Sequence, residues 1–402
     1  MSDRIFITGY GIITSIGRNA SENYQSLIQR KSGFGSLEFL DTVHKYDIPA
    51  CEIKFSDKEL CELAGVSPKR GYTRTVVLGI IAAKEAIQMA GLTAEEIRGA
   101  GLLSATTTGG IRELERYYYE LQSKSQHGDF EQYADTANPG EHSERMADEF
   151  GIKNYVATVS TACSSSANTI MLGARLITNG QLDTAICGGA EALSKFTING
   201  FNSLLILDKE HCRPFDNSRK GLNLGEGAAY VVLESEEQVR RSGKKPIAVL
   251  TGYGNTNDAF HQTASSPDGT GAYLAMKIAL DKASLPPSAI SYINTHGTAT
   301  ENNDLSEGLA IEKIFGDKVP PFSSTKPYTG HTLAAAGSVE AVYCMMALQK
   351  KVMFPNMNYR QKMDELRIEP QTELTEEREV QNVLSNSFGF GGNSSSLILS
   401  AV

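Results

Sequence analysis

The sequence predicts an α/β fold, because short apolar segments typical of strands alternate with longer segments typical of helices. Strands are expected at residues 4–8, 101–105, 155–160, 184–187, 246–254, 290–294, 320–324, 381–386 and 395–401. Helices are expected at residues 75–90, 161–177, 271–284 and 332–349. With 402 residues and 41% hydrophobic residues, the chain is long enough to bury the core of roughly two or three domain-sized units.

The alternation restarts after a charged segment, residues 234–245, which reads ESEEQVRRSGKK. We interpret this segment as a solvated helix and loop at the junction of two halves, residues 1–250 and 251–402. Each half contains a small-residue helix after a strand and turn: TACSSSANTIMLGARL in the first half and GHTLAAAGSVEAVYCMMAL in the second. This similarity suggests an internal duplication.

Composition argues against several classes of protein. The formal net charge of −9 is unlike that of a nucleic-acid binder, which usually carries a basic face. No stretch approaches the roughly 20 apolar residues of a membrane helix, and the N-terminal MSDRIFITGYGIITSIG is typical of a strand, not of a signal peptide. The six cysteines form no CxxC pair, which favours a reducing compartment and no metal site. We therefore expect a soluble, cytoplasmic protein.

Residues 113–149 form a long polar segment, unlike the rest of the chain. Two interpretations stay open. The segment is a surface excursion, or it is a dimer or lid element near the functional site, because loops of this length are uncommon unless they are functional or disordered.

Cys163 lies in the segment STACSSS, between an expected strand and an expected helix. A thiol at the start of a helix lies near free backbone N–H groups and the positive end of the helix dipole, which is expected to lower its pKa. The alternative is a buried structural cysteine, which is the usual state of this residue. The other five cysteines lack this setting, so we expect them to be structural.

Two histidines and a glycine-rich loop follow further along the chain. His296 lies in NTHGTAT and His331 in SSTKPYTGH, each after an expected strand. The segment NSFGFGGN, residues 386–393, has enough glycine to direct backbone N–H groups at a ligand. Each motif alone is weak evidence for a site.

In this order, the cysteine, the two histidines and the glycine-rich loop resemble the β-ketoacyl synthase family of the thiolase superfamily. The resemblance covers nearly the whole chain, and it includes ITGYGIITSIG, GGAEA, RPFD and GLNLGEG. It is strongest to the discrete elongating synthases of fatty-acid and type II polyketide systems. It implies a thiolase-like five-layered αβαβα sandwich of two similar halves, assembled as a homodimer or as a heterodimer with a related subunit.

The resemblance implies an acyltransferase that carries an acyl chain on Cys163. His296 and His331 would donate hydrogen bonds, as neutral imidazoles, to the thioester carbonyl of malonyl-acyl carrier protein during decarboxylative condensation. The backbone N–H groups of Cys163 and Phe390 would form the oxyanion hole, and Phe390 would act as a gate. Lys326 would support the histidines. No cofactor is implied, because phosphopantetheine arrives on the carrier protein.

Further roles are implied for residues around this centre. Asp304, Glu307 and Glu340 would orient Lys326 and the histidine helix, although solvated acids on a helix face are the simpler interpretation of the residues alone. Thr298 and Thr300 would bind the pantetheine amides. Because carrier proteins are acidic, the docking face is expected to be basic. The candidates for this face, any of which could equally be an ordinary surface cation, are Lys69, Arg70, Arg74 and Arg213.

The chain departs from the family pattern in three places. Residues 300–304 lack the usual Pro and Gly, Asn393 replaces a frequent threonine, and residues 139–144 are polar where related synthases are mostly apolar around the acyl tunnel. The polar stretch favours a specialised polyene or polyketide pathway over housekeeping fatty-acid elongation. A thiolase is disfavoured because the C-terminal glycine-rich loop has no cysteine. The remaining alternative is a non-catalytic chain-length or scaffold partner of an active synthase.

Overall fold

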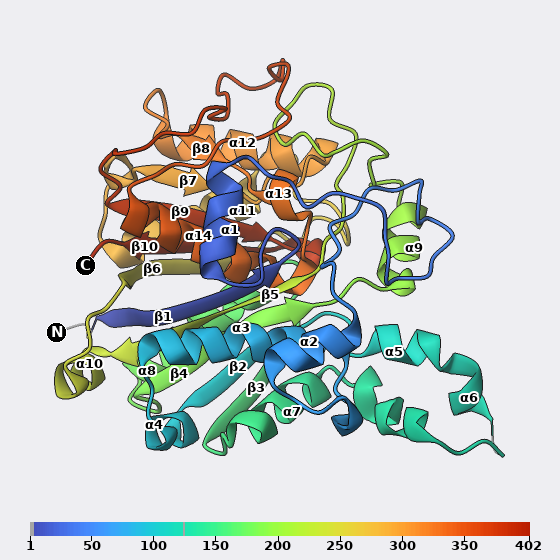
Figure 1. The fold of residues 1–402 in the computed structure, drawn as a ribbon. Helices are drawn as coiled ribbons and strands as arrows, with labels where there is room; N and C mark the ends of the chain where they lie inside the picture. The colour runs from blue at the N-terminus through green and yellow to red at the C-terminus, as the bar shows by residue number, and fades with distance from the viewer. Residues whose placement is uncertain (1–3, 124) are drawn as a thin grey trace.

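The computed structural model describes residues 4–402 except residue 124, and its ten strands form one mixed sheet (Figure 1). The order of strands across the sheet is β3-β2-β4-β5-β1-β6-β10-β9-β7-β8. The first five strands are β1 (Ile5–Thr14), β2 (Gly101–Ala105), β3 (Tyr155–Val159), β4 (Thr184–Glu191) and β5 (Gly227–Ser235). The last five are β6 (Ala248–Asn257), β7 (Tyr292–Asn294), β8 (Phe322–Ser323), β9 (Asn382–Phe388) and β10 (Asn393–Ser400).

The two sets of five strands have the same topology. Counted from the first strand of each set, both run in the order 3-2-4-5-1, and they meet where the two first strands, β1 and β6, pair side by side. The antiparallel pairs at this junction are Phe6 with Val249 and Ile7 with Ala248. The chain thus folds into two similar halves. Their division at residue 250 stays a prediction, because the sheet is continuous across the junction.

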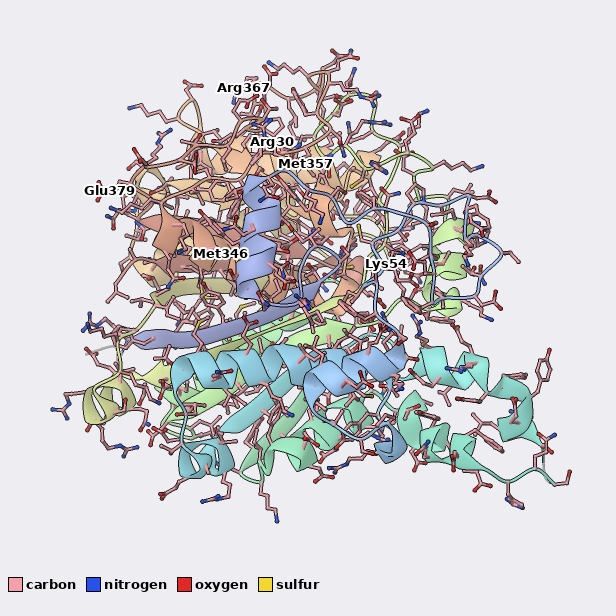
Figure 2. The ribbon with its side chains drawn as sticks, in the orientation of Figure 1. Arg30, Lys54, Met346, Met357, Arg367 and Glu379 are labelled. Atoms are coloured by element: carbon pink, nitrogen blue, oxygen red, sulfur yellow. The ribbon has the colours of Figure 1, made fainter. Side chains whose placement is uncertain are left out.

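Helices above, between and below the two half-sheets complete five layers. Helix α3 (Arg74–Ala90) packs on the outer face of the N-terminal half-sheet, and α11 (Thr270–Ala283) with α12 (Glu301–Phe315) covers the outer face of the C-terminal one. Helices α8 (Ser165–Thr178) and α14 (Ala336–Lys350) lie between the half-sheets, since each contacts strands of both. The expected αβαβα sandwich is confirmed. Figure 2 shows Met346 of α14 inside the molecule, whereas Arg367 lies on its outer rim.

Shorter helices connect these layers. They are α1 (Ala20–Ile28), α2 (Asp57–Ala64), α4 (Ala94–Gly99), α5 (Ile111–Arg116), α6 (Tyr118–Gln122), α7 (Gly140–Phe150), α9 (Lys195–Ser203), α10 (Glu236–Ser242) and α13 (Lys326–Thr329). Single turns of 3-10 helix lie at Pro68–Arg70, Pro287–Ala289, Leu333–Ala335 and Phe390–Gly392, and a longer one lies at Asp129–Ala137. Among the described residues, no helix is both long enough and apolar enough to span a membrane.

The sequence missed one central strand of the sheet completely and parts of two others. Strand β1 was expected to stop at a glycine turn after residue 8, but it continues through Gly9 and Gly11 to Thr14. These glycines serve packing, because α3 crosses them closely: a Cβ atom on Gly11 would lie 2.1 Å from the carbonyl oxygen of Ala82. Strand β5 was not predicted at all, and β4 continues past residue 187 to Glu191.

The polar segment 113–149 is only partly a surface excursion. Its last part is helix α7, which packs against α3, β2 and β3 and so belongs to the fold. Helix α6 and the 3-10 helix before α7 project from the body of the protein (Figure 1), and Tyr119 is 84% exposed there. A dimer or lid role for the projecting part stays a prediction.

The contact between β1 and α3 gives a direct test of the packing. Replacing Gly11 by Ala places a methyl group inside the contact distance of α3 backbone atoms, so we expect Gly11→Ala to lower the free energy of unfolding by about 1–3 kcal/mol. Gly99→Ala is the matched control, because no atom lies within 4 Å of a Cβ built there. Urea unfolding followed by circular dichroism measures both, and equal stability of the two variants would contradict this packing.

Candidate active site

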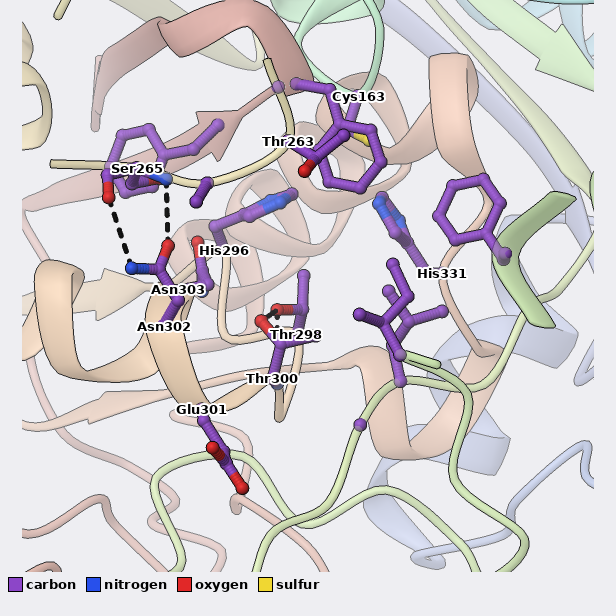
Figure 3. Close-up of a pocket in the computed structure, with 18 of the residues that line it drawn as sticks. Cys163, Thr263, Ser265, His296, Thr298, Thr300, Glu301, Asn302, Asn303 and His331 are labelled. Atoms are coloured by element: carbon purple, nitrogen blue, oxygen red, sulfur yellow. Dashed lines mark hydrogen bonds between the residues drawn. The ribbon is translucent and has the colours of Figure 1, made fainter. Parts of the chain in front are cut away.

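Cys163, His296, His331 and Phe390 line one cavity of about 350 Å³, and Figure 3 shows both imidazole rings directed toward the cysteine. Each residue lies at an end of a strand or helix. Cys163 is in the turn between β3 and α8, and His296 is in the loop between β7 and α12. His331 follows α13, and Phe390 is in the turn between β9 and β10. The structure therefore brings together four residues that are far apart in the sequence, since Cys163 and Phe390 are separated by 227 positions.

The contact between the two middle helices produces this arrangement. Gly337, in the first turn of α14, lies so close to α8 that a Cβ atom there would be 2.7 Å from the backbone nitrogen of Ala167. Beside it, the N–H of Ser338 donates to Ser166 Oγ at 2.9 Å. The first turns of the two helices are thus in contact. Cys163 precedes one helix and His331 precedes the other, so both face the same space.

The thiol of Cys163 is 5% exposed, and burial raises its pKa to about 12. Lys326 and the backbone N–H of Phe390 act in the opposite direction, but they do not offset the loss of solvation. The expectation of a lowered pKa was therefore wrong. Helix α8 begins only at Ser165, and the apolar surroundings outweigh its dipole. At neutral pH the residue rests as a thiol.

His296 and His331 lie with ring centroids 5.3 Å apart, in an edge-to-face arrangement. Burial, together with the nearby charge of Lys326, holds the pKa of both imidazoles well below its usual value. Both rings are therefore neutral at pH 7. Lys326 Nζ lies 3.3 Å from His296 Nδ1, and an ammonium group can only donate. The proton of His296 is therefore on Nε2.

Lys326 is itself buried, and its ammonium group has three partners in the site. It forms an ion pair of 2.5 Å with Glu340 of α14, donates to the carbonyl oxygen of His296, and contacts His296 Nδ1. Burial raises the pKa of Glu340 to about 7, against the effect of Lys326. This pair ties the loop that carries His296 to the helix that follows His331.

Asp304 and Glu307 have different partners from those we expected. Glu307 accepts hydrogen bonds from the backbone N–H groups of His296 at 3.0 Å and of Gly297 at 2.9 Å. Asp304 accepts from the N–H of Ala299 at 3.1 Å. Neither acid contacts Lys326, so that part of the expectation was wrong. Both instead hold the backbone of the histidine loop, and burial raises the pKa of each carboxyl, that of Glu307 to about 7.

Thr298 and Thr300 line the same cavity, with their hydroxyl oxygens 2.9 Å apart. Beside them, the side chain of Asn302 forms two hydrogen bonds with the backbone of Ser265 (Figure 3). These polar groups follow the wall of the cavity from the histidine loop. Their proposed contact with pantetheine amides stays a prediction.

Two of the four expected docking cations are buried, and a docking role for Lys69 and Arg70 stays a prediction. Arg74 is 1% exposed and forms a buried ion pair of 2.6 Å with Glu226, while Arg213 is 2% exposed and pairs with acids at positions 208 and 210. A docking role for these two residues was wrong, because neither side chain reaches the surface. Arg70 is exposed. The side chain of Lys69 lies outside what the structure describes.

The polar stretch 139–144 does not line the cavity within one chain. His142 is instead buried beneath α7, with its Nε2 atom 2.8 Å from Ser104 Oγ, and burial lowers its pKa to about 4. His142 and Ser143 of this stretch thus hydrogen-bond inside the N-terminal half. The specialised pathway that they suggested stays a prediction.

Asn393 has a role in the site that sequence reasoning missed. Its Oδ1 atom accepts from Ser164 Oγ at 2.6 Å, from Asn168 Nδ2 at 3.0 Å and from Asn255 Nδ2 at 3.0 Å. One oxygen therefore links the end of the Phe390 turn to the residue after Cys163, to α8 and to β6. The only signal in the sequence was an amide where a threonine is frequent.

Comparison with known proteins gives matches over most of the chain. A family model described as "Beta-ketoacyl synthase, N-terminal domain" matches residues 2–239, and "Beta-ketoacyl synthase, C-terminal domain" matches residues 247–360. The chain is 33% identical to 3-oxoacyl-[acyl-carrier-protein] synthase 2 of Rhizobium meliloti (strain 1021), covering 98% of each protein. It is 30% identical to the synthase of the same name from Staphylococcus aureus (strain COL), covering 98% of this chain and 97% of that protein.

Solved structures give the same result. The ishigamide ketosynthase/chain length factor superposes with a TM-score of 0.92 at 29% identity, covering 100% of both chains. The ketosynthase ApeO, in complex with its chain length factor ApeC from Xenorhabdus doucetiae, gives 0.85 at 31% identity, covering 100% of this chain and 98% of that one. A type II polyketide synthase complex, AntDE with the acyl-carrier protein AntF, gives 0.88 at 25% identity, covering 100% of both.

The Asn393 contacts predict how the turn at Phe390 is held against Cys163. Asn393→Ala removes the Oδ1 acceptor and so frees this turn. Losing roughly 1.4 kcal/mol of hydrogen bonding makes an open turn about tenfold more populated. We therefore expect iodoacetamide to alkylate Cys163 about tenfold faster in this variant. Asn393→Asp keeps an acceptor oxygen and should give no acceleration. Peptide mass spectrometry measures the rates.

The matched control is Asn382→Ala, at the far end of β9, where the amide bonds the carbonyl oxygen of Ala289. An Asn393→Ala rate no faster than that of the control would show that Asn393 does not anchor the turn.

Proposed function

The chain belongs to the β-ketoacyl synthase family, and from its site we propose how it works as a 3-oxoacyl-[acyl-carrier-protein] synthase. The observation that carries the proposal is the cavity in which one thiol faces two neutral imidazoles. A thiol can carry an acyl group, and neutral imidazoles can donate hydrogen bonds without attracting a permanent counter-ion.

The first half-reaction transfers an acyl group to Cys163. Its sulfur attacks the carbonyl carbon of the acyl thioester, the bond to the carrier's sulfur breaks, and the carrier leaves as a thiol. Because the pKa of Cys163 is raised, its proton leaves only as the new bond forms, and it ends on the departing sulfur of the carrier. The backbone N–H groups of Cys163 and Phe390 stabilise the negative oxygen of the tetrahedral intermediate.

The second half-reaction forms the new carbon–carbon bond. Malonyl-carrier thioester loses CO2, and the resulting enolate oxygen accepts hydrogen bonds from His296 Nε2–H and from His331. These bonds strengthen as negative charge develops, so they favour the transition state over the substrate. The enolate carbon attacks the acyl-cysteine carbonyl, the bond to Cys163 sulfur breaks, and a β-ketoacyl-carrier is released. The sulfur then takes up a proton from solvent and returns to the thiol. Lys326 acts through His296, whose Nδ1 atom it keeps unprotonated.

The carrier protein and a second subunit are the partners we propose. Strand β3 forms a free edge of the sheet, and all five of its residues are half-buried in a single chain. Unpaired strand edges are usually covered. A second copy or a related subunit at this edge would do so, as two of the superposed structures pair a ketosynthase with a chain length factor. The non-catalytic alternative is not favoured, because the complete set of Cys163, His296, His331 and Lys326 is assembled.

Pathway, location and cofactor are further parts of the proposal. For the pathway we propose specialised metabolism, and comparing acyl donors tests this choice. All six cysteines are free thiols, which agrees with a reducing, cytoplasmic location. We propose that phosphopantetheine is supplied by the carrier protein and that the enzyme holds no cofactor of its own.

Intact-mass spectrometry tests the proposed function. With acyl-carrier protein supplied, wild type should gain the mass of one acyl group and Cys163→Ala should gain none. Cys61→Ala is the control, because that thiol packs in α2, outside the cavity. Malonyl-carrier added to the acylated enzyme should then yield a β-ketoacyl-carrier. Absence of acylation with every donor, alone or with a candidate partner subunit, would identify the chain as the non-catalytic subunit.

A further inference from the structure

The mouth of the cavity carries an apolar surface that the reaction itself does not explain. Leu205 lines the cavity leading to Cys163, yet its side chain is 86% exposed. Leu204 is 45% exposed beside it, and the half-exposed Ile206 also lines the cavity. A cluster of exposed large apolar side chains at one place usually marks a contact with another molecule. We call residues 204–206 the mouth ridge.

The backbone of the mouth ridge is held in an unfavourable conformation. Leu205 has φ of +57°, in the left-handed region, which residues with a branched side chain rarely adopt. Its N–H bonds the carbonyl of Asn202 at the end of α9. The chain after it is braced by hydrogen bonds of 2.9 Å between Leu222 N–H and the carbonyl of Ile206 and between Asp208 N–H and the carbonyl of Leu222. The fold thus holds a strained leucine in solvent, at the entrance of the site.

Charge at the mouth does not account for recognition of an acidic partner. The charged side chains that line the cavity are Lys220 and Glu301, both exposed and opposite in sign. Two of the cations expected for docking, Arg74 and Arg213, are buried in ion pairs. Lys220 and Glu301 offset each other at the rim, so burial of apolar surface is the contribution that the mouth itself can make to binding.

We propose that the mouth ridge is the docking surface for the acyl carrier protein, which contacts it through an apolar patch. This inference rests on the proposed function. A thioester arm that reaches Cys163 must pass the cavity mouth, so the body of its carrier covers the residues that surround the mouth. Leu205 is the apolar side chain that the carrier would desolvate there, with Lys220 at the rim.

Leu205→Asn tests the proposal with little risk to the fold, because asparagine adopts the left-handed region more readily than leucine. We expect KM for acyl-carrier protein to rise about tenfold, with kcat unchanged. Transfer from the small thioester acyl-N-acetylcysteamine, which has no carrier body, should change less than about twofold. The matched control is Leu63→Asn on α2, where the leucine is 46% exposed and does not line the cavity. It should alter neither substrate.

Salt dependence gives a second readout. Raising the ionic strength from about 0.1 M to about 1 M shortens the Debye length from about 10 Å to about 3 Å. Apolar docking predicts that KM for acyl-carrier protein changes little or falls, whereas docking through cations predicts a steep rise.

Four kinds of outcome would contradict the proposal, and each has a different cause. An unchanged KM for acyl-carrier protein in Leu205→Asn, or a steep rise with salt, would place docking elsewhere. Equal losses with both thioesters would assign Leu205 to the cavity and not to the carrier. A change of oligomeric state in size-exclusion chromatography would make the mouth ridge a subunit interface. Failure of wild type to accept an acyl group from either thioester would instead contradict the proposed function, and this inference with it.

Discussion

The close contact between the first turns of α8 and α14 is the constraint on which the site depends. Gly337 has no side chain, so α14 reaches the backbone of α8 at Ala167, and Ser338 is hydrogen-bonded to Ser166. The two helices belong to different halves of the chain, yet both lie in the middle layer of the sandwich. Their contact places the nucleophile turn beside the histidines. It also buries all three reactive groups, which sets their protonation states.

Burial explains why the chemistry needs a buried cation. In an apolar site the thiol stays protonated and the imidazoles stay neutral, so the resting site carries little charge of its own. Lys326, paired with Glu340, adds a fixed positive charge behind His296 without entering the cavity. This charge opposes protonation of both rings, and its contact with Nδ1 leaves the Nε2–H group of His296 free to donate. The site is thereby prepared to stabilise negative charge as it forms.

Local patterns in the sequence were enough to place the reactive residues at strand ends and turns, since strand, turn and helix signals surround Cys163 and His331. The family resemblance added which of them act together. What the sequence could not supply depends on contacts between distant segments. The passage of β1 through Gly9 and Gly11 depends on α3, and the burial of Arg74 depends on Glu226. The direction of the Cys163 pKa shift likewise follows from packing on every side, not from the helix start that the sequence reveals.

The protonation state of His296 is the most direct test of this account. Long-range ¹⁵N–¹H NMR of protein labelled at its seven histidines, assigned with a His296→Gln variant, reports the charge and the tautomer of each ring. We expect a neutral His296 with its proton on Nε2 at neutral pH, and a titration midpoint well below the ordinary value of about 6.5, because burial and Lys326 lower its pKa. A titration midpoint near about 6.5, or a proton on Nδ1, would contradict it.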